Sequence, residues 1–158
     1  MSDTLLARLE AESAVRRLVG LYCDAVNRLD ASAAIALYAP DAKIRIADGP
    51  EIAGAGAIGA GMAQSFANFD FLRMQCTVSA IDVDGNRARA RLLVFEAAHK
   101  PGDDHIGLLW GQYEDHYTQL VEGWRFQRRR YTLQLRAKVP AAKIQLVPGF
   151  DLAFSFAP

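Results

Sequence analysis

The chain has 158 residues, of which 51% are hydrophobic and 23% charged, and its 18 basic residues balance 18 acidic ones. This composition is that of one soluble globular domain with a core. The neutral balance excludes strong electrostatic binding to nucleic acid or membrane surfaces, and no apolar run approaches the roughly 18 residues of a membrane span. A charged N-terminus unlike a signal peptide, and two cysteines without metal-type spacing, predict a cytoplasmic protein with reduced thiols.

The first long element is predicted to be an amphipathic helix from Ser13 to Asp30, because apolar residues recur there at three- and four-residue spacing. Residues 4–12 either form a short preceding helix or its first turns. The apolar stripe, continued by one turn from Val26, reaches Asp30. This carboxylate either turns outward where the helix ends or points into a cavity that the apolar face covers.

The next elements are predicted from capping residues and alternation. A short helix over 34–38, capped by Asp30 or Ser32, is expected to end at Pro40. Strands are expected at 43–47 and around 51–52, and a glycine- and alanine-rich helix from 57 to 69. Four strands joined by short turns follow, at 72–84, 87–99, 105–121 and 124–136. Helices first and an antiparallel meander later predict an α+β fold.

The C-terminal residues 137–158 carry too much apolar surface to remain in water. They are expected to dock on their own barrel, to cap a pocket or to pack on another subunit, and capping together with an oligomer contact is the favoured prediction. The chain is therefore divided into a domain at 1–136 and a tail at 137–158.

Acid–base chemistry in an apolar cavity is the reaction class that the residues favour. The three histidines lack HxH or HExxH spacing, which predicts no metal site, and neither a nucleophile motif nor a phosphate loop occurs. Asp30 is the leading candidate base, since burial would raise its pKa. Tyr22 is a candidate hydrogen-bonding group of the pocket, and His99 lies at a strand end near the expected rim.

Alternation sorts the side chains of the last two strands onto two faces. Tyr113, Asp115 and Tyr117 share one face of the first strand, and Trp110, Gln112, Glu114 and His116 share the other. One of these faces is expected to look into the cavity, and the pattern leaves open which one. In the last strand, Phe126, Arg128 and Arg130 form one row and Gln127, Arg129 and Tyr131 the other. At least one arginine is thus expected inside, where it would stabilise developing negative charge or orient a carboxylate.

Four segments in this order resemble SnoaL-like proteins of the nuclear-transport-factor-2-like superfamily: Arg16–Asp30, Ala36–Ile44, Ile81–Ala90 and Gly111–Arg130. The resemblance covers most of residues 10–135. It implies a cone-shaped, strongly curved, mainly antiparallel sheet that wraps around N-terminal helices and encloses an apolar pocket. The chain is most similar to the branch with scytalone dehydratase and hexachlorocyclohexane dehydrochlorinase, enzymes that eliminate water or HCl without a cofactor.

The resemblance also assigns residues. In that branch an aspartate at the end of the first long helix works with a histidine on a following strand. Asp30 matches the aspartate, but Met74 or Gln75 stands where the histidine is expected, so Asp30 would act alone or with a group such as His99. Arg129 matches a pocket-lining arginine. The apolar tail resembles a C-terminus that covers the pocket mouth, often in a trimer.

The sequence thus predicts a cofactor-independent lyase, a dehydratase or related β-elimination enzyme, for a small, largely apolar cyclic substrate. An isomerase or cyclase using the same base, a non-catalytic small-molecule-binding protein, and a structural subunit of a larger oxygenase are the alternatives. A homo-oligomer, dimer or trimer, is expected. The candidate catalytic residues are Asp30, Arg129, His99 and Tyr22, and the candidate substrate contacts are Ile44, Met74, Gln75, Trp110 and Tyr113.

Overall fold

Helices precede most of the strands in the computed structural model of the chain, which describes residues 2–143. The helices are α1 (Ser2–Asn27), α2 (Ala31–Ile35), α3 (Ala55–Phe66) and a 3-10 turn, Ala141–Lys143. The strands are β1 (Tyr38–Ile46), β2 (Glu51–Ala53), β3 (Phe71–Asp84), β4 (Arg87–His99), β5 (His105–Leu120) and β6 (Gly123–Pro140). Within the described residues, no helix has the length and hydropathy of a membrane span.

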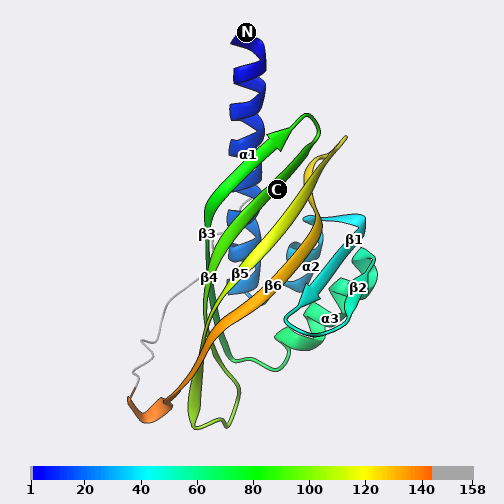
Figure 1. Cartoon of the computed structure of the whole chain (residues 1–158). Coiled ribbons are helices and arrows are strands. Elements are labelled where there is room, and N and C mark those ends of the chain that lie inside the picture. The colour runs from blue at the N-terminus through cyan, green and yellow to red at the C-terminus, as the bar shows by residue number, and fades with distance from the viewer. Residues whose placement is uncertain (1, 144–158) are drawn as a thin grey trace.

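The strands form one curved, unclosed sheet in the order β2-β1-β6-β5-β4-β3. All neighbouring strands pair antiparallel except β1 and β6, which run parallel. The sheet curves around α1, whose first turns project beyond the sheet, and α2 and α3 lie beside β1 and β2 (Figure 1). The predicted α+β class and the strongly curved, mainly antiparallel sheet are confirmed.

The apolar stripe of α1 is buried against the concave face of the sheet, as predicted. The Tyr22 ring packs edge to face on Phe126 of β6, at a centroid distance of 5.5 Å, and so joins the helix to the sheet. The stripe and its main sheet neighbours are Val15, Leu18, Val19, Tyr22, Ala25 and Val26 on the helix and Leu92, Val94 and Phe126 on the strands, each at most 4% exposed.

The end of α1 differs from the prediction. The helix stops at Asn27 because Leu29 takes a left-handed conformation with φ of 57°. The Asp30 amide then donates to the Ala25 carbonyl and the Leu29 amide to the Val26 carbonyl, which is the paired bonding of a Schellman motif. The chain therefore leaves the helix before Asp30, so the stripe does not extend to that residue.

Proline accounts for a second difference, in β1. The second helix ends at Ile35 rather than near Pro40, and β1 already begins at Tyr38. Pro40 lies inside the strand, at the irregularity between Tyr38 and Lys43 in the pairing with β6. Because proline has no amide hydrogen to donate, it is tolerated where the ladder is interrupted.

A bulge in β6 corrects the predicted rows of that strand. The pairing with β5 shifts between His116 and Tyr117, whose partners are Arg128 and Phe126, so Gln127 is the extra residue. Phe126 and Arg129 are therefore both buried, while Arg128 is exposed. Simple alternation had placed Phe126 and Arg129 on opposite faces.

The predicted boundary at residue 136 falls inside β6, which continues to Pro140. Residues 144–158, and with them most of the predicted capping tail, lie outside the described residues.

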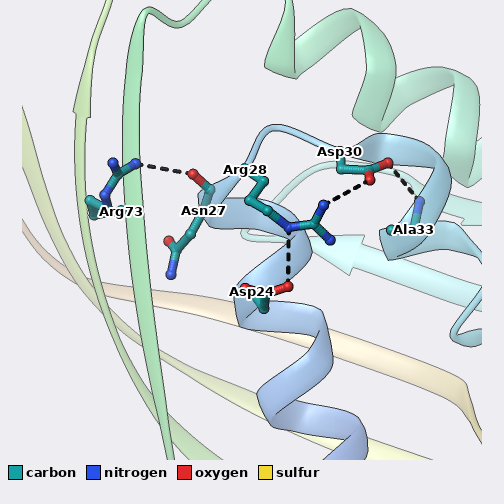
Figure 2. Close-up of polar contacts among 6 residues, drawn as sticks. All are labelled: Asp24, Asn27, Arg28, Asp30, Ala33 and Arg73. Atoms are coloured by element: carbon teal, nitrogen blue, oxygen red, sulfur yellow. Dashed lines mark hydrogen bonds and ion pairs between the residues drawn. The ribbon is translucent and has the colours of Figure 1, made fainter. Parts of the chain in front are cut away.

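Asn27 joins the end of α1 to the edge strand β3. Its Nδ2 donates to the Met74 carbonyl at 3.1 Å, and its Oδ1 accepts from the Met74 amide at 2.6 Å. Arg73 adds a bond from its guanidinium to the Asn27 carbonyl, drawn in Figure 2. The Asn27 side-chain amide thus satisfies two backbone groups of the edge strand β3, which has no neighbouring strand on that side.

Asn27→Ala is expected to lower the free energy of unfolding by about 2–3 kcal/mol, since both Met74 backbone groups would lose their partner. Urea unfolding measures the loss. Asn68→Ala is the matched control, because Asn68 makes one exposed bond to the Gln64 carbonyl, and a change below about 0.5 kcal/mol is expected there. Equal losses in the two variants would contradict the proposed link.

Candidate active site

An apolar cavity of about 320 Å³ lies between the helices and the concave face of the sheet. Its wall is built mainly from aliphatic and aromatic side chains, with very few polar groups, as small-molecule sites usually are. The lining residues are Tyr22, Val26, Ile44, Ile46, Ile52, Ile58, Gly61, Met62, Ser65, Phe66, Phe69, Leu72, Met74, Glu96, Leu109, Tyr113 and Tyr131.

Glu96 is the one carboxylate among these lining residues. It lies on β4 between Met74 of β3 and Leu109 of β5, its cross-strand partners, which also line the cavity. Its side chain has no ion pair or hydrogen bond with the described residues, and burial raises its pKa above the ordinary glutamate value. A carboxylate with a raised pKa in an apolar cavity is suited to accept and return a proton.

Tyr131 lines the same cavity and carries a buried hydroxyl. Its Oη is buried and has no hydrogen-bond partner among the described residues. The ring lies 5.1 Å from that of Tyr113, its cross-strand partner. Burial is the main cause that raises the pKa of Tyr131, and the charge of Glu96 adds to it. The hydroxyl therefore stays protonated, as a hydrogen-bond donor without an acceptor among the described residues.

Gly111 makes room for the Tyr131 ring. A Cβ at this position would lie 2.5 Å from Cε2, Cζ and Oη of Tyr131. The ladder between β5 and β6 is irregular beside it, between Trp110 and Gly111. Glycine here is needed for close approach and not for an unusual backbone conformation.

Tyr22 and Tyr113 separate the cavity from a buried cation. Both rings line the cavity on one side, while the Arg129 guanidinium carbon lies 4.2 Å from the Tyr22 ring centroid and 3.9 Å from that of Tyr113. Phe126 contributes a third ring, at 4.1 Å. Burial raises the pKa of both tyrosines well above 10, and Arg129 acts in the opposite direction.

Arg129 is completely buried and paired with Asp115. Its Nε and Nη2 donate to the two carboxylate oxygens at 3.0 and 3.1 Å, and its Nη1 donates to the Tyr38 hydroxyl at 3.2 Å. Tyr117 donates to Asp115 at 3.1 Å. Arg129 thus faces inward as predicted for one arginine, but it lies behind the tyrosines and is not among the residues that line the cavity. The prediction that Arg129 contacts the substrate directly is therefore corrected, because Tyr22 and Tyr113 lie between its guanidinium and the cavity.

Asp30 has a capping role in the structure. Its Oδ1 accepts from the Ala33 amide at 2.8 Å at the start of α2, and Arg28, which also pairs with Asp24, reaches its Oδ2 at 3.4 Å (Figure 2). The side chain is 36% exposed and is not among the described residues that line the cavity. Of the two orientations considered from the sequence, the structure therefore has the cap and not the cavity-facing base.

His99 is also occupied elsewhere. Its Nδ1 pairs with Asp70 Oδ1 at 2.6 Å, and its Nε2 with the Asp103 carbonyl at 2.8 Å. The Asp103 carbonyl is the main cause that raises the pKa of His99, followed by Asp70. With both ring nitrogens used at the end of β4, His99 ties the loop to the sheet. Nothing in this geometry brings it to the cavity.

The predicted substrate contacts divide between the two faces of the sheet. Ile44, Met74 and Tyr113 lie in the cavity wall, as does Tyr22. Trp110 lies on the outer face, 42% exposed and packed on Phe95 at 4.7 Å between centroids, and Gln75 is exposed. Their predicted cavity contacts are wrong, because alternation from the inward residues Met74 and Tyr113 sends both side chains outward.

Glu96, Tyr131 and Ser65 are the polar cavity residues that the sequence prediction missed as functional candidates. The usable signal for Glu96 was one acidic residue within the apolar run Leu92–Ala98, where a solvent-facing strand would alternate. A possible cation-ligand grouping among the described residues, Asp103, Asp104 and His105, is exposed in the β4–β5 loop and outside the cavity.

Gly111→Ala is expected to lower the free energy of unfolding by about 1–3 kcal/mol, because the added methyl overlaps the Tyr131 ring. Gly107→Ala on the same strand is the control, since its Cβ would meet only the Ala98 carbonyl oxygen, at 3.7 Å. Thermal and urea unfolding measure both variants. An equally large loss for Gly107→Ala would show that the strand, not the ring, sets the requirement.

Glu96→Gln is expected to stabilise the fold at neutral pH. A raised pKa means that the folded state holds the Glu96 proton more tightly, so wild-type stability falls as pH rises from the unfolded-state value to the folded-state one. The amide removes this pH-dependent loss. Unfolding free energies of both proteins should therefore agree at the acid end of that range and diverge above it, and parallel profiles would contradict burial of the charge.

Several solved structures share this fold. A search of curated proteins finds no match. Among solved structures, a proposed scytalone dehydratase from Novosphingobium aromaticivorans has a TM-score of 0.78 at 22% identity, over 87% of this chain and 91% of that chain. A hexachlorocyclohexane dehydrochlorinase of type 2 has a TM-score of 0.77 at 13% identity, over 90% of this chain and 97% of that chain.

A proposed dehydratase of the NTF2-like family from Streptomyces avermitilis is similar in the same way, with a TM-score of 0.72 at 15% identity over 80% of this chain and 97% of that chain. At such identities these likenesses establish the fold alone. The family model of the SnoaL-like domain matches residues 7–130, which include nearly all the cavity wall. The chain belongs to the SnoaL-like family.

Proposed function

We propose that the protein is a cofactor-independent lyase of the dehydratase type, in which Glu96 transfers the proton. The observation that carries this proposal is a carboxylate with a raised pKa in an apolar cavity that Tyr131 also lines. Neither the Glu96 carboxylate nor the Tyr131 hydroxyl has a partner among the described residues. The names of the similar structures, which include dehydratases and a dehydrochlorinase, support elimination as the reaction.

The proposed reaction begins with a carbon acid next to a carbonyl group. The Glu96 carboxylate removes the proton from this carbon, and Tyr131 donates a hydrogen bond to the carbonyl oxygen as negative charge develops there. Electrons then form the new double bond while a β-hydroxyl leaves, and this hydroxyl takes the proton from the Glu96 carboxylic acid as water. Glu96 ends as the carboxylate with which it began.

The wall also indicates the class of substrate. No lysine or arginine is among the described lining residues, and Arg129 is sealed behind Tyr22 and Tyr113. An anionic substrate would meet Glu96 without a compensating cation, which costs free energy in an apolar site. A small, uncharged cyclic hydroxyketone fits the cavity better than a carboxylate or phosphate. Isomerisation follows from the same first step if the proton returns to a different carbon.

The test compares Glu96→Gln with Asp30→Asn, because these residues are the two competing bases. The assay follows loss of water, and exchange of α-protons in D₂O, over a panel of cyclic β-hydroxyketones. Glu96→Gln is expected to lower turnover by about 10²–10⁴. Asp30→Asn should leave turnover near the wild-type level, since asparagine caps α2 as well as aspartate does.

Tyr131→Phe should reduce turnover by about 10²-fold while leaving binding of the apolar substrate nearly unchanged, because its bond strengthens in the transition state. Loss of turnover in Asp30→Asn with retention in Glu96→Gln would overturn the assignment and favour the base first expected from the sequence. Tight binding of the panel without exchange or elimination in the wild type would favour a binding protein.

A further inference from the structure

Cys23 and Cys76 are the only two cysteines in the chain, and the fold places them together. Cys23 lies on α1 and Cys76 on β3, both as free thiols that are partly buried against the core. The acid–base chemistry proposed for the cavity uses neither thiol. Their proximity therefore needs its own explanation.

The bonds between Asn27 and Met74 determine how the two elements are aligned. Cys23 precedes Asn27 by four residues, so it lies about one turn back on the same face of the helix. Cys76 follows Met74 by two residues, so it shares that face of the strand. One helical turn and two strand residues span similar lengths, roughly 5.4 and 6.8 Å. The two cysteines are therefore displaced by similar distances from the Asn27–Met74 bonds and lie side by side. The two thiols are therefore neighbours, and each is the largest influence on the pKa of the other.

The two thiols are not equivalent. Contact with the Cys76 side chain is the main cause that lowers the pKa of Cys23, and the Cys76 backbone and Arg129 act in the same direction. The same contact, followed by burial, raises the pKa of Cys76. Cys23 is thus the thiol more readily converted to the nucleophilic thiolate.

We propose that Cys23 and Cys76 form a reversible intramolecular disulfide when the protein meets a low-molecular-weight disulfide. The Cys23 thiolate attacks one sulfur of the oxidant, forms a mixed disulfide and releases the first thiol. Cys76 then loses its proton, attacks the Cys23 sulfur and releases the second. Two protein thiols are oxidised and one small disulfide is reduced. The new bond joins α1 to β3 beside Tyr22 and Met74, two residues of the cavity wall.

The test treats the full-length protein with oxidised glutathione and follows intact mass, peptide mapping under non-reducing conditions and thermal unfolding. The expected product has lost two hydrogens, contains a linked Cys23–Cys76 peptide and unfolds about 10 °C higher than the reduced protein. Dithiothreitol should restore the original mass and melting temperature. Cys76→Ser should instead retain a single glutathione adduct on Cys23, and Cys23→Ser should remain largely unmodified.

Any of three results would overturn the proposal. These are two thiols that stay reduced, two separate glutathione adducts, and a disulfide between chains that appears as a dimer on a non-reducing gel. Melting temperatures of the two serine variants without oxidant serve as folding controls. The wild-type mass decides the question even if a variant fails to fold, and no readout depends on the activity proposed for the cavity.

Discussion

The buried ion pair of Arg129 and Asp115 is the interaction on which the rest of the structure depends. Both side chains are fully excluded from solvent, and the guanidinium is held by two carboxylate contacts while aromatic rings cover its faces. Removing one partner of such a pair typically costs about 3–5 kcal/mol, because the other charge stays buried and unpaired. The pair therefore fixes β5, β6, the bulge at Gln127 and the tyrosines that stack on the arginine in one arrangement.

This arrangement separates two electrostatic environments. Arg129 is neutralised behind Tyr22 and Tyr113, whereas Glu96 stands on the cavity side of the same rings without a counter-ion among the described residues. A carboxylate near an accessible arginine would be a weak base, because the cation would favour its charged form. Sequestering the arginine leaves Glu96 with a raised pKa. Stability at this position is reduced in exchange for a group that can transfer protons, a compromise common in active sites.

Patterns of apolar residues predicted the long helix, the later strands and their order, because burial against a sheet leaves a periodic trace. The site was harder to predict, since three local irregularities change which side chains reach it. Leu29 ends α1 in a left-handed conformation normally taken by glycine, and Asp30 becomes a cap. Gln127 shifts the phase of β6, and the role of Gly111 depends on a tyrosine from another strand. Irregularities of a single residue leave no trace in the periodic pattern of apolar residues.

The central claim, that Glu96 is the proton-transfer group of an apolar cavity, is tested most directly by a ¹³C NMR titration of its side-chain carboxyl in the folded protein, assigned with Glu96→Gln. The account predicts an apparent pKa clearly above the ordinary value of about 4.3. Addition of an uncharged cyclic ketone that occupies the cavity should raise it further, because the ligand displaces water from the charged form. A pKa at or below the ordinary value, unaffected by such ligands, would contradict the account.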